Sequence, residues 1–302
     1  MEITVGIDEK TSQKDLDMLL CAGATEFYCG IMPFEWANKY AVQVSTNRLA
    51  GEKYQFASFN SLTAIVEKIH SAGKKVYVSF DALYYTKDQL PYFPKYLNIL
   101  KKLEIDGLLV SDVSLLLFLR EEHFKFKIIM NGNAGIYNSR SLKYFRKFGV
   151  SRIIFPMDMT VSEIEKIIVL TSDPGLEYQA YISAERCLFS AAYCHVSHGF
   201  GKLSDFCRFL WNKEIFVRIP VENYQGIISK KEITDIVKLI PKPDIKLLKT
   251  MKNNAGQYNL FAGSGIENII GLKESLRSTC GLCAISMLEK IGVTALKVVS
   301  RV

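Results

Sequence analysis

The 302-residue chain has no apolar run long enough to cross a membrane and no basic start followed by an apolar stretch. Residues 1–5 therefore do not resemble a secretory signal. The longest apolar run, around residues 115–119, is too short and too closely flanked by charges to span a bilayer. These absences predict a cytoplasmic protein, in which cysteines stay reduced and gather for metal binding or catalysis more often than for disulfides.

Several well-known motifs are also missing. No Gly-x-Gly-x-x-Gly follows a predicted strand, which argues against a dinucleotide-binding fold. His-Glu-x-x-His and Gly-x-Ser-x-Gly do not occur, so no hydrolytic site of a known type is present. Internal repeats, low-complexity tracts and arginine-rich runs are absent as well. A hydrolase therefore has no motif to support it.

The composition does provide a large core and a basic surface. Hydrophobic residues make up 49% of the chain, which is ample for one sizeable domain. The net charge is +7, and basic residues gather in residues 139–147 and 230–252. A basic surface favours nucleic acid or an anionic membrane as partner, although solvated helix faces give the same pattern. Charge alone does not decide between these possibilities.

Short β-rich runs alternate with amphipathic helical stretches along most of the chain. Strands are predicted at residues 3–7, 26–31, 75–80, 107–111, 127–130, 152–155, 177–182 and 296–300. One of the helices between them should begin at Asn60 or Ser61 and end at Gly73. Eight such units favour an α/β protein of the (β/α)8 TIM-like barrel class, with residues 1–302 as a single barrel domain.

The far end of the chain breaks this rhythm. Residues 208–279 are predicted to form an insertion between the seventh and eighth strands. The sequence stops at Val302, directly after the eighth predicted strand, so no final helix is expected. A barrel without that helix would expose an apolar flank, which predicts a protein partner or a homodimer there.

Five of the seven cysteines lie in the last two-fifths of the chain, at Cys187, Cys194, Cys207, Cys280 and Cys283. In a barrel, strands end and helices begin at the face that carries the chemistry. Cys187 follows the seventh strand and Cys280 precedes the next helix, so both should lie at that face. Four thiolates suit a [4Fe–4S] cluster. Spacing alone leaves a redox-active pair, half a zinc site or ordinary buried cysteines open.

The segment LEYQAYISAERCLFSAAYCHVS, residues 176–197, resembles the signature of the collagenase-like peptidase family, peptidase family U32. Cys187 and Cys194 fall in register with that signature. Tyr181 stands where phenylalanine is usual, and Gln179 where glutamate is usual. The likeness extends over nearly the whole chain and includes DGLLVSD at residues 106–112.

This resemblance implies an oxygen-sensitive [4Fe–4S] cluster held by Cys187, Cys194, Cys207 and Cys280, with Cys283 as a spare thiol or alternative ligand. Members of the family take part in oxygen-independent hydroxylation of RNA or of the ubiquinone ring, and prephenate is implicated as the oxygen donor. We expect this chain to act in such a modification. The family name leaves a peptidase as the alternative, and a non-catalytic cluster-bearing subunit of a paralogue complex is another.

Polar residues near the predicted strand ends complete the candidate site. Asp81 and Asp112 follow the third and fourth strands, where either could act as an acid/base or as a hydrogen-bond anchor, with loop capping open for at least one. Arg48 could hold a substrate carboxylate or phosphate, or lie on the surface. Asn133 carries an amide that could bind substrate. Arg186 could pair either with Glu185 or with substrate.

Overall fold

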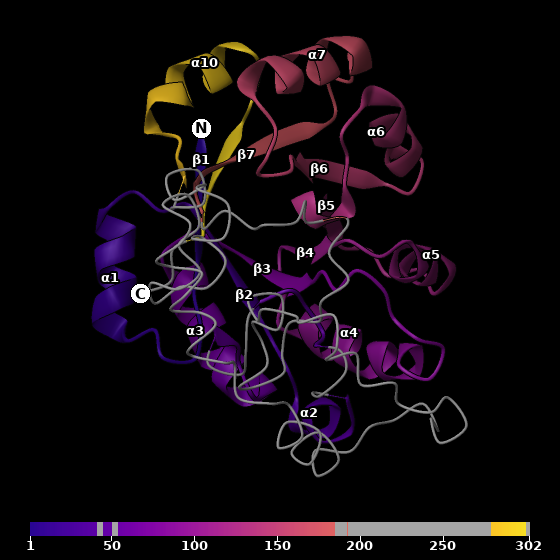
Figure 1. The fold of residues 1–302 in the computed structure, drawn as a ribbon. Helices are drawn as coiled ribbons and strands as arrows, with labels where there is room; N and C mark the ends of the chain where they lie inside the picture. Colours follow the sequence, from indigo (N-terminus) through magenta and orange to yellow (C-terminus); the bar gives the residue numbers. More distant parts are fainter. Residues whose placement is uncertain (41–44, 50–53, 185–191, 193–278, 300–302) are drawn as a thin grey trace, which may run out of the picture.

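The computed structural model describes residues 1–40, 45–49, 54–184, 192 and 279–299, and within them eight parallel strands close into a barrel (Figure 1). The order around the barrel follows the chain, and β9 closes the ring by pairing with both β7 and β1. The barrel strands are β1 (Glu2–Gly6), β2 (Glu26–Gly30), β3 (Lys75–Phe80), β4 (Gly107–Val110), β5 (Lys127–Met130), β6 (Val150–Ile154), β7 (Glu177–Ala184) and β9 (Ala295–Val298). The predicted (β/α)8 barrel is confirmed.

Helices surround the barrel between successive strands (Figure 1). They are α1 (Gln13–Cys21), α2 (Phe34–Tyr40), α3 (Phe59–Ser71), α4 (Phe93–Lys102), α5 (Val113–Glu121), α6 (Ser139–Arg146), α7 (Val161–Thr171) and α10 (Ile285–Lys290). The predicted start of α3 at Asn60 or Ser61 was wrong. Ser58 caps this helix, because its hydroxyl accepts the backbone N–H of Ser61 at 3.1 Å.

Side chains alternate between the inside of the barrel and its helix-covered outside. On β2, Phe27 and Cys29 pack outward against the helices, whereas Tyr28 faces the interior. Tyr28 joins an apolar cluster inside the barrel whose other buried members are Leu49, Tyr77, Leu109, Ile129 and Ile154. The interior is therefore a packed core rather than a channel.

A buried charged network fills the amino-terminal half of the barrel. Arg152 donates to Glu26 through both terminal nitrogens, at 2.5 and 2.8 Å, and through Nε to Glu177 at 2.6 Å. Glu26 also accepts the hydroxyls of Thr4 at 2.7 Å and Tyr77 at 2.9 Å. Burial acts to raise the pKa of Glu26, but the hydrogen bonds and charge of Arg152 outweigh it and hold that pKa below its ordinary value. Glu26 is therefore a buried, ionised and fully paired group.

The end of the chain is described only in part. The predicted insertion at residues 208–279 lies outside the described residues except for Thr279, which opens the two-residue strand β8 (Thr279–Cys280). The eighth barrel strand is Ala295–Val298 rather than residues 296–300. The expected missing final helix and open flank stay predictions. In the part of the chain that the structure covers, no helix is both long and apolar enough to cross a membrane.

Candidate functional site

Polar side chains gather where the barrel strands end. Asp81 directly follows β3, Asn131 directly follows β5, and Tyr181 belongs to β7. These three residues stand on alternate strands, as the side chains of one interior layer do in a (β/α)8 barrel. Asp81 is 1% exposed and Asn131 4% exposed. They lie at the carboxyl end of the barrel, the face that carries the chemistry in proteins of this fold.

Hydrogen bonds link the three side chains in a row, which we call the Asp81–Asn131–Tyr181 chain. Tyr181 donates its hydroxyl to Asn131 Oδ1 at 2.8 Å, and the backbone N–H of Gly132 donates to the same oxygen at 2.8 Å. The amide nitrogen of Asn131 must then face away from these donors, and it donates to Asp81 Oδ2. Desolvation raises the pKa of Tyr181 well above its usual range, so its hydroxyl remains a donor.

Asp81 also organises two other residues predicted from the sequence. Its Oδ1 accepts the backbone N–H of Arg48 at 2.9 Å, and its Oδ2 accepts the amide of Asn133 at 3.4 Å. The structure thus brings together Arg48 from the loop between α2 and α3, Asp81 from the end of β3, and Asn133 from the turn after β5. Their proposed catalytic and substrate-binding roles stay predictions.

The loop that carries Arg48 is fixed by buried polar contacts. Asn47 donates to Gln55 Oε1 at 2.6 Å and accepts the backbone N–H of Leu49 at 2.9 Å. The loop passes so close to β2 that a Cβ on Gly30 would lie 2.6 Å from a methyl carbon of Leu49. A side chain at this position would therefore have to displace the side chains of Leu49 and Asn47.

Asp112 lies near this site but serves a different contact. Its carboxylate accepts the backbone N–H of Ser114 at 3.0 Å as the N-cap of α5, and that of Tyr85 at 3.1 Å. Leu109 packs inside the barrel, whereas Leu108 and Val110 pack against the helices. Continued alternation places Ser111 on the inner side and Asp112 on the helix side. The capping role left open by the sequence is present, and the catalytic role stays a prediction.

Sequence reasoning did not select several residues of this face. Lys297 on β9 is 3% exposed, with its ammonium nitrogen 4.2 Å from the ring centre of Tyr28 and 5.5 Å from that of Tyr181. The buried hydroxyls of Ser79 and Ser111 have no hydrogen-bond partner among the residues that the structure describes. Such hydroxyls are costly unless they are satisfied, which suits them to a ligand's polar group. Every second residue of a barrel strand points into the barrel, and this pattern in the sequence could have identified Lys297, Ser79 and Ser111.

The cysteines are only partly covered by the structure. Cys187, Cys194 and Cys207, together with Arg186, lie outside the described residues. Cys280 belongs to β8, which runs antiparallel to β7 and pairs Cys280 with Ser183. The backbone N–H that follows, at Gly281, donates to the carbonyl of Ile182 at 2.7 Å. The backbone of Cys280 is therefore held at the carboxyl end of β7.

The other described cysteines have different surroundings. Cys283 is exposed in a short 3-10 turn, and Cys21 is exposed at the end of α1. Cys29 is buried behind β2, where burial raises the pKa of its thiol to about 12 and keeps it protonated. Within the described residues, no group of three His, Cys, Asp or Glu side chains is placed to hold a metal ion.

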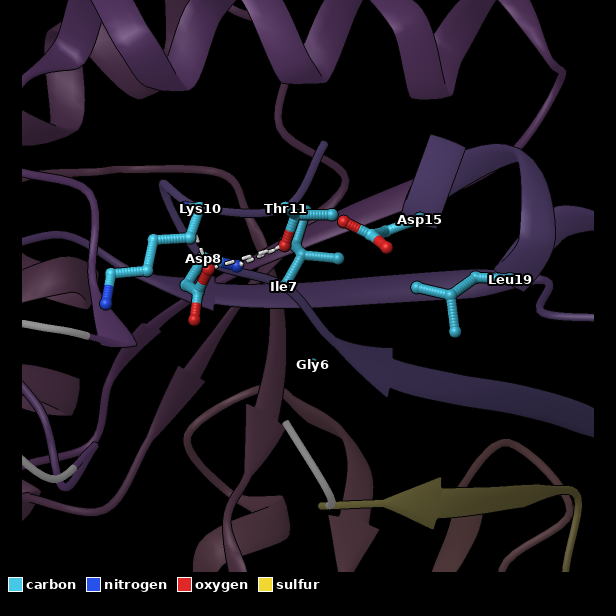
Figure 2. Close-up of a pocket in the computed structure, with 7 residues that line it drawn as sticks. All are labelled: Gly6, Ile7, Asp8, Lys10, Thr11, Asp15 and Leu19. Carbon is cyan, nitrogen blue, oxygen red and sulfur yellow. Dashed lines mark hydrogen bonds between the residues drawn. The ribbon is translucent and has the colours of Figure 1, made fainter. Parts of the chain in front are cut away.

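A small pocket lies beside the end of β1, between that strand and α1 (Figure 2). Its volume is about 40 Å³, which is enough for water and too little for a nucleotide. Asp8 closes one side, where its carboxylate accepts the backbone N–H of Lys10 at 2.9 Å. The lining residues are Gly6, Ile7, Asp8, Lys10, Thr11, Asp15 and Leu19. This pocket is therefore separate from the Asp81–Asn131–Tyr181 chain.

Replacing Asp81 by asparagine should loosen the mouth of the barrel. An asparagine can turn its oxygen toward Asn131 or toward the backbone of Arg48, so its NH2 group always faces one of these donors. We expect a loss of about 1–3 kcal/mol in the free energy of unfolding and faster hydrogen exchange at the Arg48 amide. Urea titration and exchange mass spectrometry measure both.

Asp158→Asn is the control, because Asp158 is exposed and also accepts a tyrosine hydroxyl. This change should alter stability by less than about 0.5 kcal/mol. Unchanged exchange at Arg48 would contradict this role of Asp81.

The structure defines a (β/α)8 protein with a cluster of polar side chains at the carboxyl end of the barrel. The model of Peptidase family U32 matches residues 11–302. The chain therefore belongs to peptidase family U32.

Relatives with curated names are tRNA hydroxylation proteins. Protein P of Escherichia coli (strain K12) is 22% identical over 95% of this chain, which spans only 61% of that relative's length. Protein P2 of Bacillus subtilis (strain 168) is 25% identical over 76% of this chain and 72% of its own. Among solved structures, a U32 peptidase is 14% identical with a TM-score of 0.47, and covers 76% of this chain and 86% of that one.

Proposed function

We propose that this protein takes part in the oxygen-independent hydroxylation of RNA, with tRNA as the substrate class. The family match over nearly the whole chain and the names of the curated relatives support this proposal. The chain spans about three-fifths of the length of the Escherichia coli relative. The hydroxylation activity is therefore a proposal for this chain.

We further propose a [4Fe–4S] cluster bound by Cys187, Cys194, Cys207 and Cys280. The observation that supports it best is the pairing of β8 with β7. Ser183, the partner of Cys280, precedes Cys187 by four residues, so the Cα atoms of Ser183 and Cys187 cannot be more than about 14 Å apart. Two proposed ligands that are 93 positions apart in the chain can thus meet at one strand end. The cluster would supply electron transfer when bound.

The Asp81–Asn131–Tyr181 chain and its neighbours would hold the small reactant at the same face. Prephenate is the oxygen donor that the family resemblance implies, and Arg48 is suited to a carboxylate through its guanidinium group. Asp81 fixes the backbone of Arg48 and orients the amide of Asn133, so these two residues would bind and orient while Asp81 positions them.

Nucleoside analysis tests the proposed substrate. A deletion strain and its parent are compared by mass spectrometry of digested tRNA and ribosomal RNA, with quinones extracted in parallel. The proposal predicts loss of a hydroxylated nucleoside from tRNA and an unchanged quinone profile. Loss of a quinone with intact nucleosides would move the substrate to an aromatic ring. Unchanged profiles in both, with a defect in peptide degradation, would favour the peptidase alternative.

A further inference from the structure

Helix α6 carries a basic and aromatic stripe on its outer side. The stripe consists of Arg140, Lys143, Tyr144 and Lys147, which recur at the i, i+3, i+4, i+7 spacing of one helix face. All four side chains are exposed, and Tyr144 retains 49% of its surface. The opposite side of α6 is buried, through Leu142 and Phe145. The stripe is therefore the solvent-facing surface of an otherwise packed helix.

Within the described part of the chain, no acidic side chain pairs with the cations of the stripe. Helix α6 contains no acidic residue. Among the described residues, Arg140, Lys143 and Lys147 take part in no ion pair. Arg146 of the same helix behaves differently, because it pairs with Asp173 at 2.7 Å and donates to the carbonyl of Val150 at 2.8 Å. Arg146 is thus structural, whereas the three cations of the stripe remain available to a polyanion.

The position of α6 links this surface to the candidate site. The helix begins at Ser139, a few residues after Asn131 and Asn133 at the end of β5. Its amino end therefore lies at the mouth of the barrel and its axis runs back along the outside. Figure 1 shows α6 outside β5 and β6, across the barrel from α1. The stripe spans about 10 Å along the helix axis.

Tyr144 adds an aromatic surface to the charges. Its ring packs edge-on against Phe148 and Phe145, with centroid distances of 5.1 and 5.5 Å, which holds it in place while half of it stays exposed. Lysines and arginines that neutralise phosphates, next to a fixed aromatic ring, are what single-stranded or looped RNA binds.

We propose that the α6 stripe binds the RNA substrate, with Arg140, Lys143 and Lys147 on phosphates and Tyr144 against a base or ribose. This inference rests on the proposed function, because it takes RNA as the substrate of the barrel mouth. The stripe holds the RNA body beside the barrel while the nucleotide to be modified reaches the site.

A charge-reversal experiment tests the stripe. The full-length protein, handled without oxygen, is titrated with bulk deacylated tRNA over a range of salt concentrations. Lys143→Glu/Lys147→Glu is compared with Lys14→Glu/Lys68→Glu, which reverses two exposed lysines on α1 and α3. Both double variants lower the net charge from +7 to +3, so they have the same effect on long-range attraction.

We expect the stripe double variant to lose about tenfold or more in affinity for tRNA. The slope of log K against log salt should become shallower by about 1.4–1.8. The control should lose far less in both.

Two aromatic variants test the ring. Tyr144→Ala should weaken tRNA binding about fivefold or more, with no change in the salt slope, and Tyr144→Phe should bind as the native protein does. Thermal unfolding of each variant shows whether the helix is intact.

The outcomes separate this inference from the proposed function. If the two double variants lost tRNA affinity equally, the proposal that the stripe binds RNA would be wrong. It would also be wrong if the native protein hydroxylates RNA while the stripe double variant binds tRNA normally. A native protein that binds no tRNA and leaves nucleosides unchanged would overturn both. Normal tRNA binding with loss of a co-purifying acidic protein would assign the stripe to that protein instead.

Discussion

Replacing Arg152 by alanine is expected to lower the free energy of unfolding by about 3–5 kcal/mol. The side chain is 2% exposed and makes two hydrogen bonds to Glu26, which is fully buried. Removing the guanidinium leaves a carboxylate inside the barrel without its counter-charge. Urea unfolding followed by circular dichroism should show a lower midpoint at an unchanged slope.

The controls use a partly exposed pair and a second change in the network. Arg146→Ala breaks the bridge to Asp173, in which the two side chains are 35% and 26% exposed, and the bond to the Val150 carbonyl. It should cost about 2 kcal/mol or less. Adding Glu26→Gln to Arg152→Ala should recover part of the loss, because the stranded charge is removed. A cost for Arg152→Ala no greater than that of Arg146→Ala would contradict the role of the buried network.

The same network should control how stability depends on acid. The pKa of Glu26 is lower in the folded protein than its ordinary value, so the ionised form stabilises the fold. That contribution is complete above the unfolded pKa of about 4.3 and is lost as the pH falls through the lower folded value. As the pH falls below about 4.3, the free energy of unfolding should therefore decrease less steeply in Glu26→Gln than in the native protein. Identical slopes in the variant and the native protein would contradict the assignment.

Cys280→Ala should abolish the visible absorption of the anaerobically purified protein and the EPR signal that appears when it is reduced, whereas Cys283→Ala should retain both. Strand pairing holds Cys280 beside Ser183 at the end of β7, and Ser183 precedes Cys187 by only four residues. Cys283 is exposed in the following turn. A missing thiolate leaves one iron of a [4Fe–4S] cluster without its protein ligand. The two cysteines are near each other in sequence, so the pair of variants discriminates sharply.

Cys21→Ala, at the exposed end of α1, is a further control that should behave as the native protein does. Far-ultraviolet circular dichroism of each variant checks that the barrel still folds. Loss of the signals in Cys283→Ala and their retention in Cys280→Ala would move the fourth ligand to Cys283. If both variants retained the signals, neither Cys280 nor Cys283 would be a required ligand of the cluster.

The barrel could be predicted because its strands carry a local signal. The predicted strands at residues 75–80 and 127–130 coincide with β3 and β5, since both are short, β-branched or aromatic runs between turn residues. The last strand was shifted by one residue at its start, because Ala295 is a weak strand former that burial inside the barrel overrides.

The contents of the barrel could not be predicted in the same way. Arg152 and Glu26 are 126 residues apart, and Gln179 reaches Thr4 across 175 residues, so no local pattern joins them. Position at a strand end selected both Asp81 and Asp112 correctly as residues of the carboxyl face. It could not tell which of them faces inward, because a one-residue change of register reverses the direction of the side chain.

The most direct test of the account is the iron and acid-labile sulfide content of the full chain purified without oxygen. The account predicts about four iron and about four sulfide per chain, lost on prolonged exposure to air together with the visible absorption. A protein free of both, or one that holds a single zinc ion in their place, would contradict it.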